Sequence, residues 1–193
     1  TGSSLDVTTT SLLSGDTVTC LATVADASGS TISDDASITL NSAPVISSVT
    51  ITSSSGNDYN DDVLTCSASV SDPDGNNTTE IYAWEDAFGQ SLGANGPTLD
   101  LTTTSVAPGE VVNCVATSTD TYGLSASVSG SLTVVNRLPI ISQVTITPTV
   151  ANNNDTIICS VNATDADGET VVNGLLSESF AWFDANSSPV GTG

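Results

Sequence analysis

Residues 62–71 read DVLTCSASVS and residues 110–119 read EVVNCVATST, and these two stretches decide the fold class of the 193-residue chain. In both, apolar and polar side chains alternate on either side of a cysteine, Cys66 in the first and Cys114 in the second. Alternation at period two is typical of a strand with one face in a core and the other in solvent. Further short segments of this kind follow about every ten residues, and no segment has a helical period. The sequence therefore predicts an all-β sandwich.

The chain repeats itself with a period of about 94 residues. Cys20 and Cys114 lie 94 residues apart, and Cys66 and Cys159 lie 93 apart. The stretch GDTVTCLAT around Cys20 parallels GEVVNCVAT around Cys114, while DVLTCS parallels DTIICS around the other pair. Two kinds of cysteine thus alternate along one repeat. The aromatic residues expected in the cores are Tyr82, Trp84, Phe180 and Trp182.

Cys66, Trp84 and Cys114 resemble the Cys, Trp, Cys core of immunoglobulin-like domains. The resemblance implies a disulfide between Cys66 on strand B and Cys114 on strand F, with Trp84 of strand C packed against it. The tyrosine expected two residues before the strand F cysteine is Val112 here and Val18 in the preceding repeat. The chain is therefore more similar to the tandem immunoglobulin-like repeats of large prokaryotic cell-surface and filament proteins than to antibody domains. The strands implied for the complete domain are A near 44–52, B 62–71, C 79–86, E 98–104, F 110–119 and G 126–135.

The repeat divides the chain into one complete domain and two half domains. The stretch PVISSVTIT at 44–52 returns as PIISQVTIT at 139–147, so a domain begins at each of these prolines. We expect the C-terminal half of a domain, strands E to G, over residues 1–42. A complete domain follows over 43–136, and the N-terminal half of another, strands A to C, over 138–193.

The two half domains complement each other in length. Joined tail to head, they separate Cys159 from Cys20 by about 52 residues, against 48 between the cysteines of the complete domain. We therefore expect residues 1–40 to complete the fold begun by residues 139–193 of an adjacent repeat or copy, with Cys159 bridged to Cys20. Because the chain does not start with Met, we favour one long chain of many repeats over separate crosslinked subunits. A closed two-domain monomer is the third arrangement.

The charge balance is extreme. The chain has 22 acidic residues against one basic residue, Arg137, and its formal net charge is −21 at pH 7. Nucleic acid and anionic membrane surfaces are excluded as partners because both are polyanions. The chain lacks His and Lys, the usual general base and Schiff-base nucleophile, so we expect no enzyme activity. Four cysteines at repeated spacing indicate disulfides made in an oxidising compartment, and we expect an extracellular, cell-surface location.

The motif at residues 72–75, DPDG, returns as DADG at 165–168, and both lie in predicted loops between strands B and C. Aspartate, proline and glycine are ordinary turn residues, which is one interpretation of both motifs. The alternative is a Ca²⁺ site, since Ca²⁺ takes oxygen ligands and relieves repulsion between carboxylates that meet at a joint. We expect one such cluster at the entry of the complete domain and one at its exit. Their members are Asp72, Asp74 and Asp120 at the entry, and Asp58, Asp61, Asp62, Asp165 and Asp167 at the exit.

Five Asn-x-Ser/Thr sequons are candidate glycan acceptors. About four are expected by chance at this Asn, Ser and Thr content, so their number carries no information. Their predicted places, in loops and on one outward strand face, are what favour glycosylation. The acceptors are Asn76, Asn77, Asn154, Asn162 and Asn186.

Two short linkers, Asn41-Ser42-Ala43 and Asn136-Arg137-Leu138, each precede a proline. Neither has the composition of a flexible tether, so we expect neighbouring domains to be held end to end. The predicted function is structural: an extracellular rod, stalk or filament whose partners are neighbouring copies or repeats. The alternative function is the spacer or binding region of a cell-surface adhesin that recognises a glycan or a protein.

Overall fold

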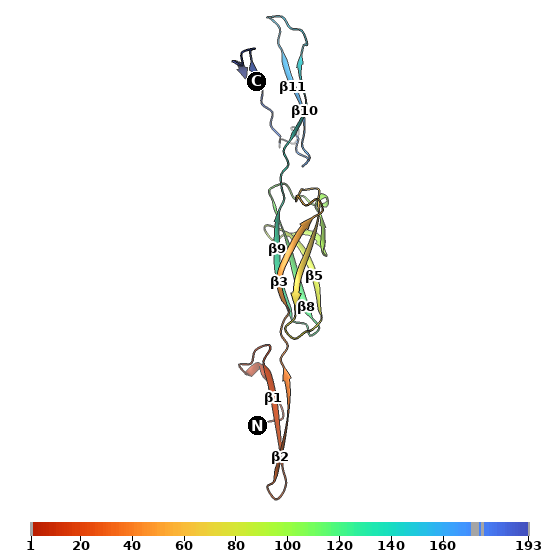
Figure 1. The fold of residues 1–193 in the computed structure, drawn as a ribbon, viewed down its shortest axis with the longest axis vertical. Helices are drawn as coiled ribbons and strands as arrows, with labels where there is room; N and C mark the ends of the chain where they lie inside the picture. The colour runs from red at the N-terminus through yellow and green to blue at the C-terminus, as the bar shows by residue number, and fades with distance from the viewer. Residues whose placement is uncertain (1, 171–173, 175, 193) are drawn as a thin grey trace.

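The computed structural model describes residues 2–170, 174 and 176–192, and this part of the chain is all-β (Figure 1). Three units follow one another along the long axis: an N-terminal unit (2–40), a central unit (43–136) and a C-terminal unit (139–192). The N-terminal and C-terminal units lie at opposite ends of the molecule, with the central unit between them (Figure 1). None of the described segments is a helix with the length and hydropathy to cross a lipid bilayer.

Two antiparallel sheets form the central unit. The first has three strands in the order β3 (Val45–Ser53), β4 (Val63–Ser71), β7 (Thr98–Asp100). The second has four strands in the order β6 (Ser91–Asn95), β5 (Thr78–Asp86), β8 (Val111–Asp120), β9 (Ser125–Thr133). The alternating sequence of each strand puts one face toward the other sheet, an arrangement consistent with a β-sandwich.

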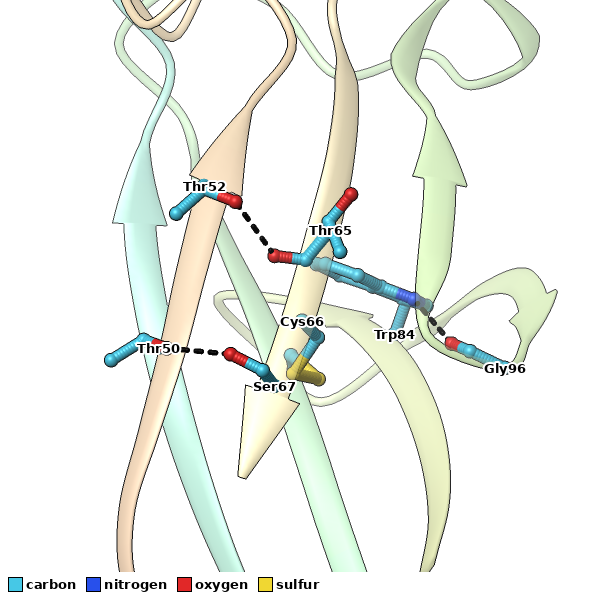
Figure 2. Close-up of a disulfide and its surroundings, with 8 residues drawn as sticks. Thr50, Thr52, Thr65, Cys66, Ser67, Trp84 and Gly96 are labelled. Atoms are coloured by element: carbon cyan, nitrogen blue, oxygen red, sulfur yellow. Dashed lines mark hydrogen bonds between the residues drawn. A yellow bond between two sulfur atoms is a disulfide. The ribbon is translucent and has the colours of Figure 1, made fainter. Parts of the chain in front are cut away.

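The core lies between these two sheets. Leu64 and Cys66 of β4 pack in one cluster with Trp84 of β5 and Cys114 of β8, and all four are buried. The expected disulfide between Cys66 and Cys114 is present, with the Cα atoms 6.4 Å apart, and it links the two sheets. Figure 2 shows the Trp84 ring beside this disulfide, with its Nε1 donating a hydrogen bond to the carbonyl oxygen of Gly96 at 3.0 Å. A link over 48 residues stabilises the fold by about 4 kcal/mol through the unfolded chain's entropy.

The outer units contain smaller sheets. In the N-terminal unit, β1 (Thr17–Ala25) pairs with β2 (Thr31–Thr39), after a single 3-10 turn, η1 (Val7–Thr9). In the C-terminal unit, β10 (Ile140–Thr147) pairs with β11 (Ile158–Thr164), and β12 (Ala181–Phe183) pairs with β13 (Pro189–Thr192). None of the buried hydrophobic residues belongs to either outer unit within the described part of the chain.

The expected strand over 98–104 is shorter in the structure, because the 3-10 turn η2 (Leu101–Thr103) follows Asp100. The Asp100 carboxylate accepts from the Thr102 N–H at 3.0 Å, and the Thr103 hydroxyl donates back to the Asp100 carbonyl at 2.8 Å. Such local hydrogen bonds compete with a strand ladder. The N-terminal unit repeats this turn at η1, capped by Asp6, and no strand precedes it among the described residues. No pattern in the sequence predicted β6, an edge strand with Gly93 in its middle.

Candidate functional site

The joint between the N-terminal and central units is held by polar contacts of the linker. Ser42 donates its backbone N–H to Asp74 Oδ2 at 2.5 Å, and Asn41 Nδ2 donates to Asp120 Oδ2 at 2.7 Å. Asn76 Nδ2 donates to Asn41 Oδ1 at 2.7 Å. Two loops of the central unit therefore fix Asn41 and Ser42 of the linker. Asp74 and Asp120 were expected at this joint, and the structure places both against it.

The joint between the central and C-terminal units is built around Arg137. Its backbone N–H and its Nε donate to Asp167 at 2.6 and 2.7 Å, and its Nη1 donates to Asp61 at 3.1 Å. Nη2 donates to Asn60 Oδ1 at 2.9 Å and to the Ala166 carbonyl at 2.8 Å. One guanidinium thus bonds to loops of both units.

A tyrosine and the burial of the ion pair reinforce this contact. The guanidinium carbon lies 4.6 Å from the centroid of the Tyr59 ring, within cation–π range. The side chain of Asp167 is 0% exposed and that of Arg137 is 18% exposed, so water screens their attraction little. Burial alone would lower the pKa of Arg137, but hydrogen bonds to Asp167 and Asp61 outweigh it and raise that pKa. Arg137 therefore stays charged at any ordinary pH.

The two joints use the same backbone device. Ser42 and Arg137 occupy matching linker positions, and each donates its N–H to the second aspartate of the following Asp-x-Asp-Gly loop, Asp74 or Asp167. The first aspartate shapes the loop: Asp72 Oδ1 accepts from two N–H groups within its own loop, at 2.9 and 3.1 Å. These are ordinary turn contacts, but they also show why the motif recurs at each linker.

One carboxylate oxygen in each loop has no partner. Asp72 Oδ2 and Asp165 Oδ2 are both shielded from solvent and accept no hydrogen bond. A buried carboxylate oxygen without a donor is costly, so an unpaired atom of this kind at the same place in both copies requires an explanation. In the described ranges, no group of three or more acidic or cysteine side chains has an arrangement that could hold a metal ion.

Asp58 and Asp62 do not join the cluster at the second joint. Asp58 accepts from the Ser53 hydroxyl at 2.6 Å, inside its own loop. Asp62 turns inward and accepts from Ser54, from Ser55 and from the Tyr59 N–H, at 2.7 to 2.8 Å. Burial alone would raise the pKa of Asp62, but these hydrogen bonds outweigh it and hold the pKa at about 2. Asp62 therefore organises the loop between β3 and β4 and contributes to the joint only indirectly.

Asp120 resembles Asp62 in its surroundings. Burial would raise its pKa, but hydrogen bonds from Asn41, Leu124 and Tyr122 outweigh burial and lower it. One oxygen of the carboxylate accepts hydrogen bonds from the turn between β8 and β9, and the other accepts from Asn41 of the linker. Its charge is thus stabilised by the contact that holds the joint.

The outer units expose apolar faces and unpaired thiols. Cys20 is exposed and Cys159 is half-buried, and neither is in a disulfide. Apolar residues of the outer strands that match core-facing positions of the central unit are exposed too, among them Ile38 at 67% and Ile146 at 51%. In the C-terminal unit an open hollow of about 400 Å³ lies between the β10–β11 pair and the segment that contains Phe180.

The five sequon asparagines differ in accessibility. Asn77, Asn154, Asn162 and Asn186 are exposed. Asn76 is half-buried, and its Nδ2, the atom that a glycan would modify, donates to Asn41 Oδ1 in the first joint. Asn76 is therefore the poorest acceptor of the five.

The sequence placed Arg137 in the second linker, but it did not indicate the contacts of Arg137 or the roles of Asn60 and Tyr59. Arg137 is the one basic residue of the chain and follows directly after a predicted domain end. That isolation was a signal that it pairs with the carboxylates gathered at the linker. Asn60 carried no such signal, because its position beside Asp167 depends on the loop conformation.

Comparison with protein-family models, with curated proteins and with solved structures finds no match to this chain.

Proposed function

We propose that this chain is a structural component of an extracellular rod, stalk or filament built from immunoglobulin-like domains joined end to end. The observation that carries the proposal is the polar clamp at both linkers, above all the contacts of Arg137 with Asp61 and Asp167. A flexible tether would need no such contacts, because its function tolerates any relative orientation. The same architecture serves as the spacer of a cell-surface adhesin.

The strand order supports the immunoglobulin-like assignment with one variation. In constant-type immunoglobulin domains the fourth strand pairs with strand E, and the other sheet has three strands. Here the fourth strand, β6, pairs with β5 of the sheet that contains β8 and β9. The disulfide between β4 and β8 and the tryptophan of β5 occupy the positions that the resemblance implies.

The rod is tested by small-angle X-ray scattering of the chain in reductant. We expect the maximum dimension of a straight molecule, with each unit contributing roughly 35 to 45 Å. Arg137→Ala and Asp74→Ala should each shorten the mean dimension, because one joint then bends. Ser42→Ala is the matched control, since only the backbone of Ser42 contacts Asp74. Scattering that stays unchanged in the Arg137→Ala, Asp74→Ala double variant contradicts the clamp.

Ca²⁺ at the joints is a second part of the proposal. The orphaned oxygens Asp72 Oδ2 and Asp165 Oδ2 favour it, since a hard cation satisfies a carboxylate oxygen that no donor reaches. In titrations with CaCl₂ we expect the thermal unfolding temperature to rise for the native chain and to rise less for Asp72→Asn and Asp165→Asn. Asp26→Asn is the control, because Asp26 caps a turn in the same way away from both joints. Equal shifts in all three variants contradict these two sites.

A further inference from the structure

The outer units together contain the elements of one central unit. In the C-terminal unit, β10, β11, β12 and β13 match β3, β4, β5 and β6 in order and in antiparallel pairing. In the N-terminal unit, η1, β1 and β2 match η2, β8 and β9. The remaining strand, β7, has its sequence counterpart in residues 4–6, SLD against TLD at 98–100. In the order of the central unit, the elements of the N-terminal unit thus follow directly on those of the C-terminal unit.

The core positions of the central unit are apolar or cysteine in the outer units as well. The nine buried core residues of the central unit are Leu64, Cys66, Trp84, Leu99, Leu101, Val106, Val112, Cys114 and Val134. Three of their counterparts lie in the C-terminal unit: Ile157, Cys159 and Trp182. The other six lie in the N-terminal unit: Leu5, Val7, Leu12, Val18, Cys20 and Leu40.

These counterparts differ from the core in exposure and not in chemistry. Leu99 is 1% exposed and its counterpart Leu5 is 58% exposed. Ile46 is 8% exposed, whereas its counterpart Ile141, which lines the hollow in the C-terminal unit, is 64% exposed. Within the described residues, each outer unit therefore has half of a core, and no second sheet covers it.

We propose that the N-terminal unit of one copy of this chain docks on the C-terminal unit of a second copy, and that Cys20 and Cys159 then form a disulfide across the new core. This rests on the proposed rod function and names its repeating contact. The two units of one molecule lie at opposite ends with the central unit between them, so a single copy does not supply both halves (Figure 1).

The strand registers place Cys20 and Cys159 at the positions that match Cys114 and Cys66 of the central unit. Cys114 lies opposite Gly130 in the β8–β9 pair, and Cys20 lies opposite the matching Ala36 in the β1–β2 pair. On the other side, Cys66 lies opposite Ile51, and Cys159 opposite Ile146. Docking in the register of the central unit therefore brings Cys20 and Cys159 together as Cys114 and Cys66 are.

Charge does not prevent this contact. The N-terminal unit contributes 5 acidic residues and the C-terminal unit 6, which equals the 11 of the central unit. A folded domain with this charge thus already exists in the chain. Because both partners are acidic, salt should accelerate docking.

One position must adapt. A Cβ at Gly130 would lie 3.0 Å from the Val49 carbonyl oxygen, and the residue that matches Gly130 is Ala36. The composite domain must therefore open by a few tenths of an ångström between β2 and β10.

The bridge is an ordinary oxidation. Each thiol loses a proton and together they lose two electrons, which oxidised glutathione accepts as its own disulfide is cleaved to two thiols. The experiment supplies oxidised glutathione to the purified full chain, and non-reducing electrophoresis follows the products. We expect a ladder in steps of 19.3 kDa that collapses on reduction, with Cys20–Cys159 as the linking peptide in mass spectrometry.

Single-cysteine variants test the polarity of the contact. Cys20→Ser and Cys159→Ser, when mixed, should give one mixed dimer at least tenfold faster than either variant links to itself. Ile38→Asp should reduce the ladder at least tenfold, because Ile38 matches a residue packed on the core, Leu132. Ser33→Asp, on the outward face of the same strand, is the matched control and should leave the ladder intact. Thiols that stay free, or self-linking as fast as mixed linking, overturn the proposal.

The docking proposal and the rod proposal are tested by different measurements, so each can fail without the other. Scattering of the reduced single chain reports the clamped joints and involves no contact between copies. If the molecule is straight but its thiols do not pair, the rod proposal stands and the composite domain is contradicted. If the molecule is bent but still forms the ladder, the composite domain stands and the rod proposal is contradicted.

Discussion

Trp84 and Trp182 occupy matching positions of one repeat, yet Trp84 is wholly buried and Trp182 is only partly covered. The local structure around such pairs is nearly the same. Asp6 and Asp100 cap the same 3-10 turn at 3.0 Å, and Thr23–Ser33 repeats the hydroxyl pair Thr117–Ser127 at 2.7 Å. Local sequence therefore suffices for caps and hairpins, whereas burial requires a second sheet.

The disulfide gives the largest expected difference between the central and outer units. Replacing Cys66 and Cys114 together by Ser should lower the free energy of unfolding of the central unit by about 4 kcal/mol. Urea unfolding followed by tryptophan fluorescence in a Trp182→Phe background, where Trp84 alone reports, measures it. Replacing Cys20 and Cys159 by Ser should leave this value unchanged in the single chain. Similar losses from both pairs would mean that the outer cysteines already stabilise the central unit.

Matching leucines sharpen the same contrast. Leu99→Ala should cost about 3 kcal/mol, because it leaves a cavity in a closed core. Leu5→Ala should leave the free energy of unfolding of the central unit unchanged, since Leu5 is 58% exposed and lies in the N-terminal unit. The same urea titration compares the two. A cost at Leu5 near that at Leu99 contradicts the view that the N-terminal unit has an uncovered face.

Acid should remove the stabilisation that the buried Asp62 contributes to the central unit. The pKa of Asp62 is about 2 in the folded chain against an ordinary value of 3.8, so the folded state binds fewer protons between these values. The stabilisation is therefore present above about pH 4, and about 2 kcal/mol is lost as the pH falls toward 2. Urea unfolding at pH 6 and pH 2.5 should show a smaller pH effect in Asp62→Asn.

The smallest expected effect concerns the close approach of β3 and β9. Gly130→Ala should destabilise the central unit by about 1 kcal/mol, because its Cβ meets the Val49 backbone. The reverse change in the N-terminal unit, Ala36→Gly, should leave the central unit unaffected and increase the yield of linked copies. If Gly130→Ala is neutral in urea unfolding, the two strands can separate at no cost and Ala36 is no obstacle to docking.

The strand positions could be read from the sequence because alternation and the cysteine spacing are both strong signals. All strands expected in the central unit were found within about two residues, apart from the early end of β7 at Asp100. β6 gave no signal, because five residues with a central glycine do not distinguish a strand from a loop. The 3-10 turn was readable in principle from Asp followed by three threonines within four positions, repeated in both units.

The joints were predictable only in part. The sequence indicated that aspartates gather at each linker, and the structure brings Asp74, Asp120, Asp61 and Asp167 there. It did not indicate that Asp58 and Asp62 bond within their own loop, because that depends on which way each carboxylate turns after a backbone reversal. Asp58 has a positive φ of 64°, a local conformation that no alternation pattern encodes.

The sequence by itself determined the all-β class, the repeat and the inward faces, because period-two alternation and spacing are properties of the chain alone, and the immunoglobulin-like resemblance implied the cysteine pair of the central unit. Only the tertiary structure decided which carboxylates reach the linkers and which apolar faces stay uncovered. Both depend on what lies opposite a residue in space: Arg137 for Asp167, and for Leu5 no covering sheet within the described chain.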